Sequence, residues 1–298
     1  MPASVRLDSP RLAAAALLLN ALIWGLSWWP FRWLDAHGLH PLWSTAAVYG
    51  AALVLTVARQ PGDALAALRQ PALLGLLASS GLTNACFNWG VSIGEVVRVV
   101  LLFYLMPVWS MLLARWWLGE ALRPVAVALA MLALAGAMLI LWEPGAGLPM
   151  PASLGDWLGL AGGVGFAMTN VLLRRQAHDA PGARAAAMFA GGMLIPATVA
   201  LIAGGLGHPV PLPRPDAQAW LPLGVFAAAF MLANLALQFG AARLPARVTA
   251  VVMLSEVVFA AVSAAWLAGE MPGHRALIGA ALILGASLLA AWREGRDP

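Results

Sequence analysis

Long apolar runs alternate with short polar connections along this chain. A helix needs about 20 residues to cross the hydrocarbon core of a membrane. Apolar runs of that length lie at 12–34, 41–58, 72–91, 96–116, 124–142, 155–174, 184–205, 219–240, 247–268 and 273–292. Most connections are short and contain turn residues, such as Gln60-Pro61-Gly62. The pattern predicts an all-α integral membrane protein with ten transmembrane helices.

The chain also repeats itself at a spacing of 150 residues. The string WWLGEALRP at 116–124 is echoed by WLAGEMPGH at 266–274, and 13 of 59 positions are identical without a gap between 84–142 and 234–292. An internal repeat in a strongly apolar chain is typical of transporters. The flexible connection at 143–153 divides the spans into two sets of five. We therefore expect one five-helix repeat over residues 1–147 and a second over residues 148–298.

The arginines indicate an orientation. All 17 basic residues are arginine, and 13 of them lie at one alternating set of span ends. The four at the opposite ends are Arg32, Arg98, Arg214 and Arg275. The positive-inside rule then predicts that both the N- and C-termini are cytoplasmic.

The number of spans in each repeat fixes how the two repeats are related. Five is odd, so the second repeat enters the membrane from the opposite side and the two repeats are inverted. Folds of this kind bind substrate near the midplane between the repeats and alternate between inward-open and outward-open forms. The alternative is that the repeat records only a duplication in a structural membrane protein.

The composition excludes several classes of function. The chain is 62% hydrophobic and 10% charged, against about 25% charged in a soluble domain, so its surface must face the lipid bilayer. Its basic residues are scattered and form no stripe, which argues against a nucleic-acid partner. One cysteine (Cys86) and five scattered histidines give no disulfide or metal-ligand spacing. We expect no metal, no cofactor, no ATP-binding P-loop and no enzymatic activity.

Two pairs of amide side chains are the first candidates for substrate binding. Asn84 and Asn88 are four residues apart and share a helix face, and Asn234 and Gln238 repeat this spacing. A buried amide must find partners. One interpretation is that both pairs line a central cavity and bind the amino and carboxylate groups of a zwitterion. The alternative is that they form hydrogen bonds between helices.

Glu256 is the only acidic residue deep within a predicted span. Such residues usually face a cavity or a partner, because a charge in the membrane interior is costly. Glu256 would therefore bind a substrate amine or couple transport to protons. The alternative is a neutral carboxyl group bonded to a neighbouring helix. Glu256 aligns with Met106 in the repeat, so this acidic group belongs to one half alone.

The aromatic residues divide by depth. Most tryptophans lie near predicted span ends, as in the interfacial belts of membrane proteins. Trp24, Trp28, Tyr104 and Trp109 lie deeper, where their rings would stack on an aromatic substrate. The alternative for these four is helix packing.

Glycines mark two further structural features. Gly119-Glu120 and Gly269-Glu270 occupy repeat-related span ends, where glycine would end a helix and glutamate would hold the start of the following one. Four glycines in the sixth predicted span favour close helix packing over a moving gate. They are Gly159, Gly162, Gly163 and Gly165.

Two long strings resemble EamA-type transporters of the drug/metabolite transporter superfamily. LLFYLMPVWSMLLARWWLGEALRPVAVALAMLALAGAMLIL is similar to the family's fourth and fifth helices, and VVMLSEVVFAAVSAAWLAGEMPGHRALIGAALILGASLLA to its ninth and tenth. Trp24-Gly25 fits the first helix, so the resemblance covers the whole chain. One departure is that Val257 follows Glu256 where proline is common, which predicts a straighter ninth helix. Pro107 keeps the corresponding break in the fourth.

The resemblance implies ten helices, a location in the bacterial inner membrane and export of metabolites. Within the family the chain looks most like bacterial exporters of aromatic amino acids. We therefore expect an exporter of small amphipathic metabolites, first of all aromatic or large neutral amino acids, that works as a monomer by alternating access. The alternatives are a multidrug or other metabolite exporter, a non-transporting membrane scaffold and an intramembrane enzyme.

Overall fold

A computed structural model describes residues 10–63, 70–117, 119, 124–142, 150–176, 179–207, 210–241, 243–244 and 252–294. Throughout these ranges the regular secondary structure is entirely α-helical. The first half contains α1 (Pro10–Leu26), α2 (Trp28–Ala36), α3 (Pro41–Arg59), α5 (Ala72–Ile93), α6 (Val96–Phe103), α7 (Met106–Trp117) and α8 (Pro124–Leu141). The second contains α9 (Leu154–Arg175), α10 (Pro181–Gly205), α11 (Trp220–Ala241), α13 (Ser255–Leu267) and α14 (His274–Glu294).

The helices coincide closely with the predicted spans. The first and fourth predicted spans are each divided into two helices, α1 and α2 in one case and α6 and α7 in the other. Residues 247–251 of the ninth predicted span lie outside the described residues. Seven of the described helical stretches are long and apolar enough to cross a membrane, and two apolar helices are shorter. The protein is therefore a multi-pass membrane protein, while the exact number of ten spans stays a prediction.

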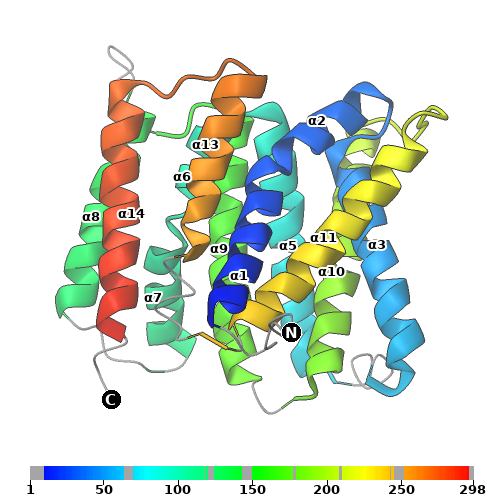
Figure 1. The fold of residues 1–298 in the computed structure, drawn as a ribbon, viewed down its shortest axis with the longest axis horizontal. Coiled ribbons are helices and arrows are strands. Elements are labelled where there is room, and N and C mark those ends of the chain that lie inside the picture. The colour runs from blue at the N-terminus through cyan, green and yellow to red at the C-terminus, as the bar shows by residue number, and fades with distance from the viewer. Residues whose placement is uncertain are drawn as a thin grey trace, which may run out of the picture.

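Contacts between the halves follow the sequence repeat. α5 packs against α9 as α11 packs against α1, and α6 packs against α9 as α13 packs against α1. Three further contacts, α3 with α10, α6 with α13 and α8 with α14, join a helix to its own repeat counterpart. Figure 1 shows α1 between α13 and α11, with the start of α1 and the end of α14 at the same end of the bundle. This is the contact pattern expected of a two-fold repeat.

A break divides the helix of the fourth predicted span. α6 ends at Phe103 and α7 begins at Met106. Pro107 has no N–H to donate to the carbonyl of Phe103, four residues earlier, so a continuous helix would lose a bond at this point. The break was predicted from this proline.

The prediction of a straighter ninth helix was wrong. A turn at Leu254 separates the helical residues 252 and 253 from α13. The hydroxyl of Ser255 donates to the carbonyl of Val252 at 2.6 Å, and the Tyr104 hydroxyl lies 3.3 Å from the carbonyl of Met253. Side-chain hydroxyls that bind backbone carbonyls compete with the helix ladder, so the break forms without proline. It lies 150 residues after Tyr104, at the position equivalent to the first break.

The two Gly-Glu pairs, Gly119-Glu120 and Gly269-Glu270, are partly as predicted. Gly119 and Gly269 have φ values of +71° and +69°, a backbone conformation that favours glycine and lets the chain turn. Glu120 lies outside the described residues. Glu270 does hold a helix start, but the helix is α6 and not the following α14: its Oε2 accepts from the N–H of Val96 at 2.8 Å.

Glycine also lets α9 approach its neighbours closely. A Cβ on Gly163 would lie 2.7 Å from the carbonyl oxygen of Phe103, and one on Gly165 would lie 2.9 Å from the hydroxyl of Thr83. Such distances leave no space for a side chain. The glycines of the sixth predicted span therefore serve close packing against α5 and α6.

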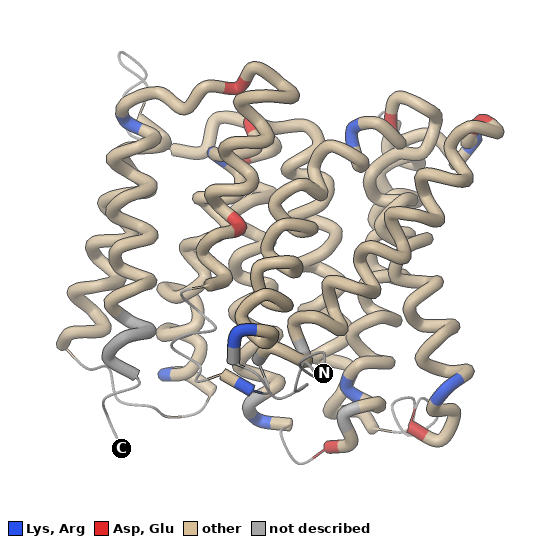
Figure 2. The backbone as a smooth tube through the Cα atoms, in the orientation of Figure 1, with Lys and Arg blue, Asp and Glu red and all other residues tan. Residues whose placement is uncertain are grey.

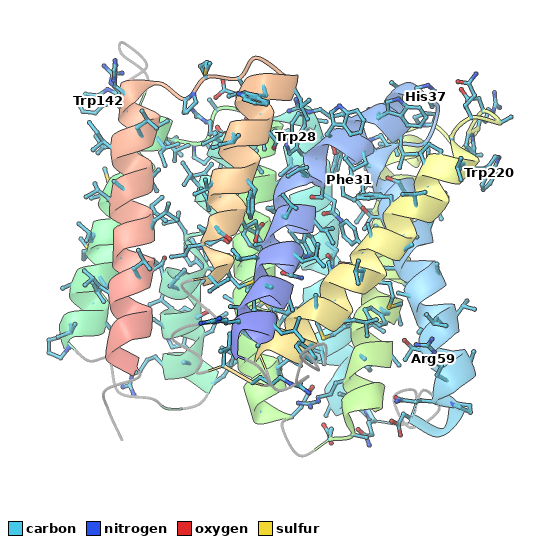
Figure 3. All side chains as sticks on the ribbon, in the orientation of Figure 1. Trp28, Phe31, His37, Arg59, Trp142 and Trp220 are labelled. Carbon is cyan, nitrogen blue, oxygen red and sulfur yellow. The ribbon has the colours of Figure 1, made fainter. Side chains whose placement is uncertain are left out.

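Tryptophan and phenylalanine side chains separate into buried and peripheral sets. Trp28 and Phe31 are 2% and 0% exposed and point into the bundle, whereas Trp142 and Trp220 are 53% and 61% exposed and lie at its edge (Figure 3). The largest hydrophobic core surrounds α6 and includes residues of α8, α13 and α14. The interior thus lies where the two halves meet.

Candidate substrate-binding site

The two helix breaks are joined by Tyr104 and Glu256. Tyr104 lies between α6 and α7 and is 3% exposed, while Glu256 lies in the first turn of α13 and is 8% exposed. The Tyr104 hydroxyl and Glu256 Oε2 are 3.1 Å apart. Figure 2 shows the charged residues at the two ends of the bundle, apart from one acidic position within α13, whose acidic residue is Glu256. The pair therefore places a carboxyl group in the interior of the bundle, between the two halves.

Two predicted tryptophans, Trp24 and Trp28, belong to the first span, which packs closely against the helix of Glu256. A Cβ on Gly25 would lie 2.7 Å from Phe259 Cβ and 2.8 Å from the carbonyl oxygen of Glu256, so the α1 backbone lies directly against the first turn of α13. Trp24 is half-buried and Trp28 is fully enclosed. The indole N–H of Trp28 donates to Ser263 at 2.9 Å, which fixes its ring against α13.

A continuous series of rings connects Trp24 to Tyr104. The centroid of Trp24 lies 4.7 Å from that of Phe230 and 6.2 Å from that of Phe87. Phe87 lies 4.7 Å from Phe103, which lies 6.1 Å from Tyr104. The three phenylalanines were not predicted as site residues. A phenylalanine within an apolar run carries no polar atom and has no sequence signal that separates it from ordinary core.

The first amide pair is engaged by α3. Asn84 donates to the carbonyl of Ser80 at 2.8 Å, and its oxygen accepts from the Tyr49 hydroxyl at 2.5 Å. Asn88 is 0% exposed and donates to the Thr45 hydroxyl at 3.1 Å. Thr45 and Tyr49 are themselves four residues apart, so two side-chain bonds link matching faces of α3 and α5. These contacts correspond to the helix–helix interpretation of the pair.

Tyr49 was missed, although a signal for it exists. The chain has only two tyrosines, and both fall within predicted spans. A phenol hydroxyl at membrane depth needs a partner, which singles out both positions. The Tyr49 ring also contacts that of Phe230, with centroids 6.3 Å apart, and so joins the series of rings that reaches Trp24.

The remaining predicted residues are less closely tied to Glu256. Asn234 is half-buried on α11, and the side chain of Gln238 lies outside the described residues. Asn20, which was missed, is fully buried on α1 and donates to the carbonyl of Ala233 at 2.7 Å. An amide side chain within an apolar run is the sequence signal that could have found it. These contacts join α1 to α11.

Trp109 differs from the other predicted aromatics in having a buried, unbonded polar atom. The residue is half-buried on α7, and its ring packs against the core around α6. Within the described residues its indole N–H has no hydrogen-bond partner. Buried donors are normally bonded. Trp109 therefore retains a free donor inside the bundle.

This arrangement can bind a ligand, and one charged group, the carboxyl of Glu256, takes part in the binding. The carboxyl of Glu256 would hold a cationic group such as an ammonium, and the neighbouring rings offer apolar and cation-binding faces. Among the described residues, no group of three or more His, Cys, Asp and Glu side chains could hold a metal ion. The predicted residues that the structure brings together are thus Trp24, Trp28, Tyr104 and Glu256.

Comparisons with known proteins agree with this architecture. The model of the EamA-like transporter family matches the chain twice, over residues 11–142 and 153–292. A solved structure titled "Crystal structure of protein" has a similar fold, with a TM-score of 0.58 and 21% sequence identity over 97% of this chain and 99% of that one. A search of curated proteins found no match.

Proposed function

Since the chain belongs to the EamA-like transporter family of the drug/metabolite transporter superfamily, and is therefore a membrane transporter of small molecules, we propose that it exports amphipathic metabolites. Aromatic or large neutral amino acids are the first candidates. The protein would work as a monomer in the bacterial inner membrane, with both termini cytoplasmic. Two inverted repeats, 1–147 and 148–298, would alternate access to a site between them.

The observation that carries this proposal is the Tyr104–Glu256 contact at the two helix breaks. Transporters with inverted repeats bind substrate where membrane helices are interrupted, because unwound backbone groups there become available to ligands. In this chain the only acidic residue deep within a predicted span lies at such a break. It also lies between the two halves, where relative movement would expose it to alternate sides.

Glu256 and the series of rings that reaches Tyr104 favour a substrate that combines an ammonium with an aromatic or large apolar group. The carboxylate provides a charge-assisted hydrogen bond to the ammonium. The rings of Trp24, Phe87 and Phe230 provide contacts worth about 0.5–1.5 kcal/mol each for an aromatic group. A multidrug exporter of organic cations is the alternative, because it would use the same carboxylate and rings.

Tyr104 also supports a role for protons in the cycle. Its hydroxyl lies within hydrogen-bond distance of two acceptors, Glu256 Oε2 and the carbonyl of Met253. When Glu256 is ionised, the hydroxyl donates to the carboxylate. When Glu256 is protonated, the carboxyl donates to the Tyr104 oxygen and the hydroxyl donates to Met253. Both protonation states are thus hydrogen-bonded, which suits an exchange of proton for substrate ammonium.

Transport by the purified protein in proteoliposomes tests the proposal. We expect labelled phenylalanine and tryptophan to enter faster than alanine, and Glu256→Gln to lower phenylalanine flux about tenfold or more, since a hydrogen bond to a charged group contributes about 1.5–3 kcal/mol. Glutamine keeps an acceptor oxygen for Tyr104, so the fold should persist.

Glu95→Gln is the matched control, because Glu95 is exposed at the start of α6 and its loss should leave flux unchanged. Alanine moving as fast as the aromatic amino acids would refute the substrate class. Full phenylalanine flux in Glu256→Gln would refute the binding role. Transport of phenethylamine without phenylalanine would favour the organic-cation alternative.

A further inference from the structure

A second group of charges joins the two halves at one end of the bundle. Arg32 lies on α2, and Glu270 lies in the connection between α13 and α14. Arg32 Nη1 and Glu270 Oε1 are 2.7 Å apart, and the other carboxylate oxygen accepts from the N–H of Val96 at 2.8 Å. One carboxylate of the second half thus binds both the first span and the start of α6.

The guanidinium of Arg32 binds further backbone groups of the first half. Its Nε donates to the carbonyl of Ser92 at 3.1 Å, and Nη2 donates to that of Gly94 at 2.6 Å, at the end of α5. The three nitrogens therefore hold α5 and Glu270 at once. The guanidinium carbon also lies 4.8 Å from the ring centroid of Trp28. The ion pair thus lies against one of the deep tryptophans beside the candidate site.

Glu120, the repeat counterpart of Glu270, lies outside the described residues, so the structure shows this ion pair at one end of the bundle. That end is the one that the arginine distribution predicts to face away from the cytoplasm.

We propose that the Arg32–Glu270 pair is a latch that holds this end of the bundle closed over the site. Opening toward this side separates α2 and the α5–α6 connection from the α13–α14 connection, which breaks the ion pair and its backbone bonds. Opening toward the opposite side leaves them intact. The proposal rests on the alternating access of the proposed function, and it adds a contact that holds one end closed.

The exposure of the latch suits repeated opening. The side chains of Arg32 and Glu270 are 27% and 23% exposed, so water reaches both and replaces their partners when they separate. A fully buried pair would leave uncompensated charges on opening. The latch therefore favours the closed end without fixing it permanently.

Distance measurements on the full chain in nanodiscs test the latch without any substrate. Spin labels at Ile93→Cys and Trp266→Cys, both exposed positions, report on the separation of the two sides in a Cys86→Ser background. We expect Glu270→Gln to increase the population with the longer separation about tenfold. Glutamine can still accept from the Val96 N–H, so this variant keeps the start of α6.

Arg32→Gln should act in the same direction, and Arg214→Gln is the control, because Arg214 is exposed and belongs to the same predicted end. Distance distributions in Glu270→Gln identical to those of the parent would overturn the latch. An equal increase in Arg214→Gln would also overturn it, since a general charge effect would then suffice. Failure of the aromatic substrates in proteoliposomes refutes the proposed substrate and leaves this measurement unaffected.

Discussion

Replacing Gly25 with alanine tests the close packing of α1 against α13 beside Glu256. The new Cβ would lie 2.7 Å from Phe259 Cβ, 2.8 Å from the carbonyl oxygen of Glu256 and 3.0 Å from the backbone nitrogen of Ala260. Two of these three atoms are backbone, so α1 and α13 must move apart. Overpacking of this kind costs about 1–3 kcal/mol.

The helix propensity of alanine acts in the opposite direction. Alanine in place of glycine within a helix contributes about 0.5–1 kcal/mol of stability. The steric term is the larger one, so Gly25→Ala should destabilise the protein by about 1 kcal/mol and lower its melting temperature by about 2–4 °C. Because the same movement withdraws α13 from α1, the flux of phenylalanine should fall as well.

The measurement is thermal unfolding followed by circular dichroism, with flux measured on the same preparation. Gly224→Ala on α11 is the matched control, because a Cβ there would meet nothing within 4 Å and only the propensity gain remains. We expect Gly224→Ala to melt at or slightly above the temperature of the parent. Equal melting temperatures and equal flux for Gly25→Ala and Gly224→Ala would refute the argument.

Two further substitutions test the bonds between helices by the same unfolding measurement. Tyr49→Phe removes the donor to the Asn84 oxygen and should cost about 1–3 kcal/mol, while the control Trp266→Phe, at an 87% exposed side chain, should cost almost nothing. Arg98→Gln should cost more, about 3 kcal/mol, because it deprives Asp156, whose side chain is 2% exposed, of two bonds at 2.7 and 2.9 Å. A smaller loss for Arg98→Gln than for Tyr49→Phe would contradict the ranking.

The positions of the helices could be predicted because each depends on a local property. A run of about 20 apolar residues has few alternatives to a membrane-spanning helix. The break before Pro107 was also local, since proline lacks a donor wherever it occurs. The break at Leu254 was not, because it involves the Tyr104 hydroxyl, which comes from the connection between α6 and α7 in the other half of the chain.

The candidate site likewise has features that local sequence could predict and features that depend on tertiary packing. Spacing placed Asn84 and Asn88 on one face of a helix, but it could not show which helix covers that face. The answer, α3 with Thr45 and Tyr49, follows from tertiary packing. Glu256 was found because an isolated carboxyl group in an apolar run is conspicuous whatever surrounds it.

Glu270 binds residues that are far away in the sequence. Its partners Arg32 and Val96 lie 238 and 174 residues earlier in the chain. The sequence placed Glu270 at the end of a predicted span. It does hold the start of a helix, as expected, but that helix is α6 and not the following one. Which helix it holds depends on how the halves interlock, and no local pattern contains that information.

The two helix breaks lie at equivalent positions of the repeat but differ in whether the helical hydrogen bonds can re-form. The fourth-span break follows from a proline ring, and no movement of the protein can restore the missing N–H. At the Leu254 break every residue from 252 to 257 keeps its backbone N–H, and the hydroxyls of Ser255 and Tyr104 lie within hydrogen-bond distance of the carbonyls of Val252 and Met253. If those hydroxyls turn away, the helix ladder can close. The first half therefore contains a permanent interruption, whereas the interruption in the second half is reversible.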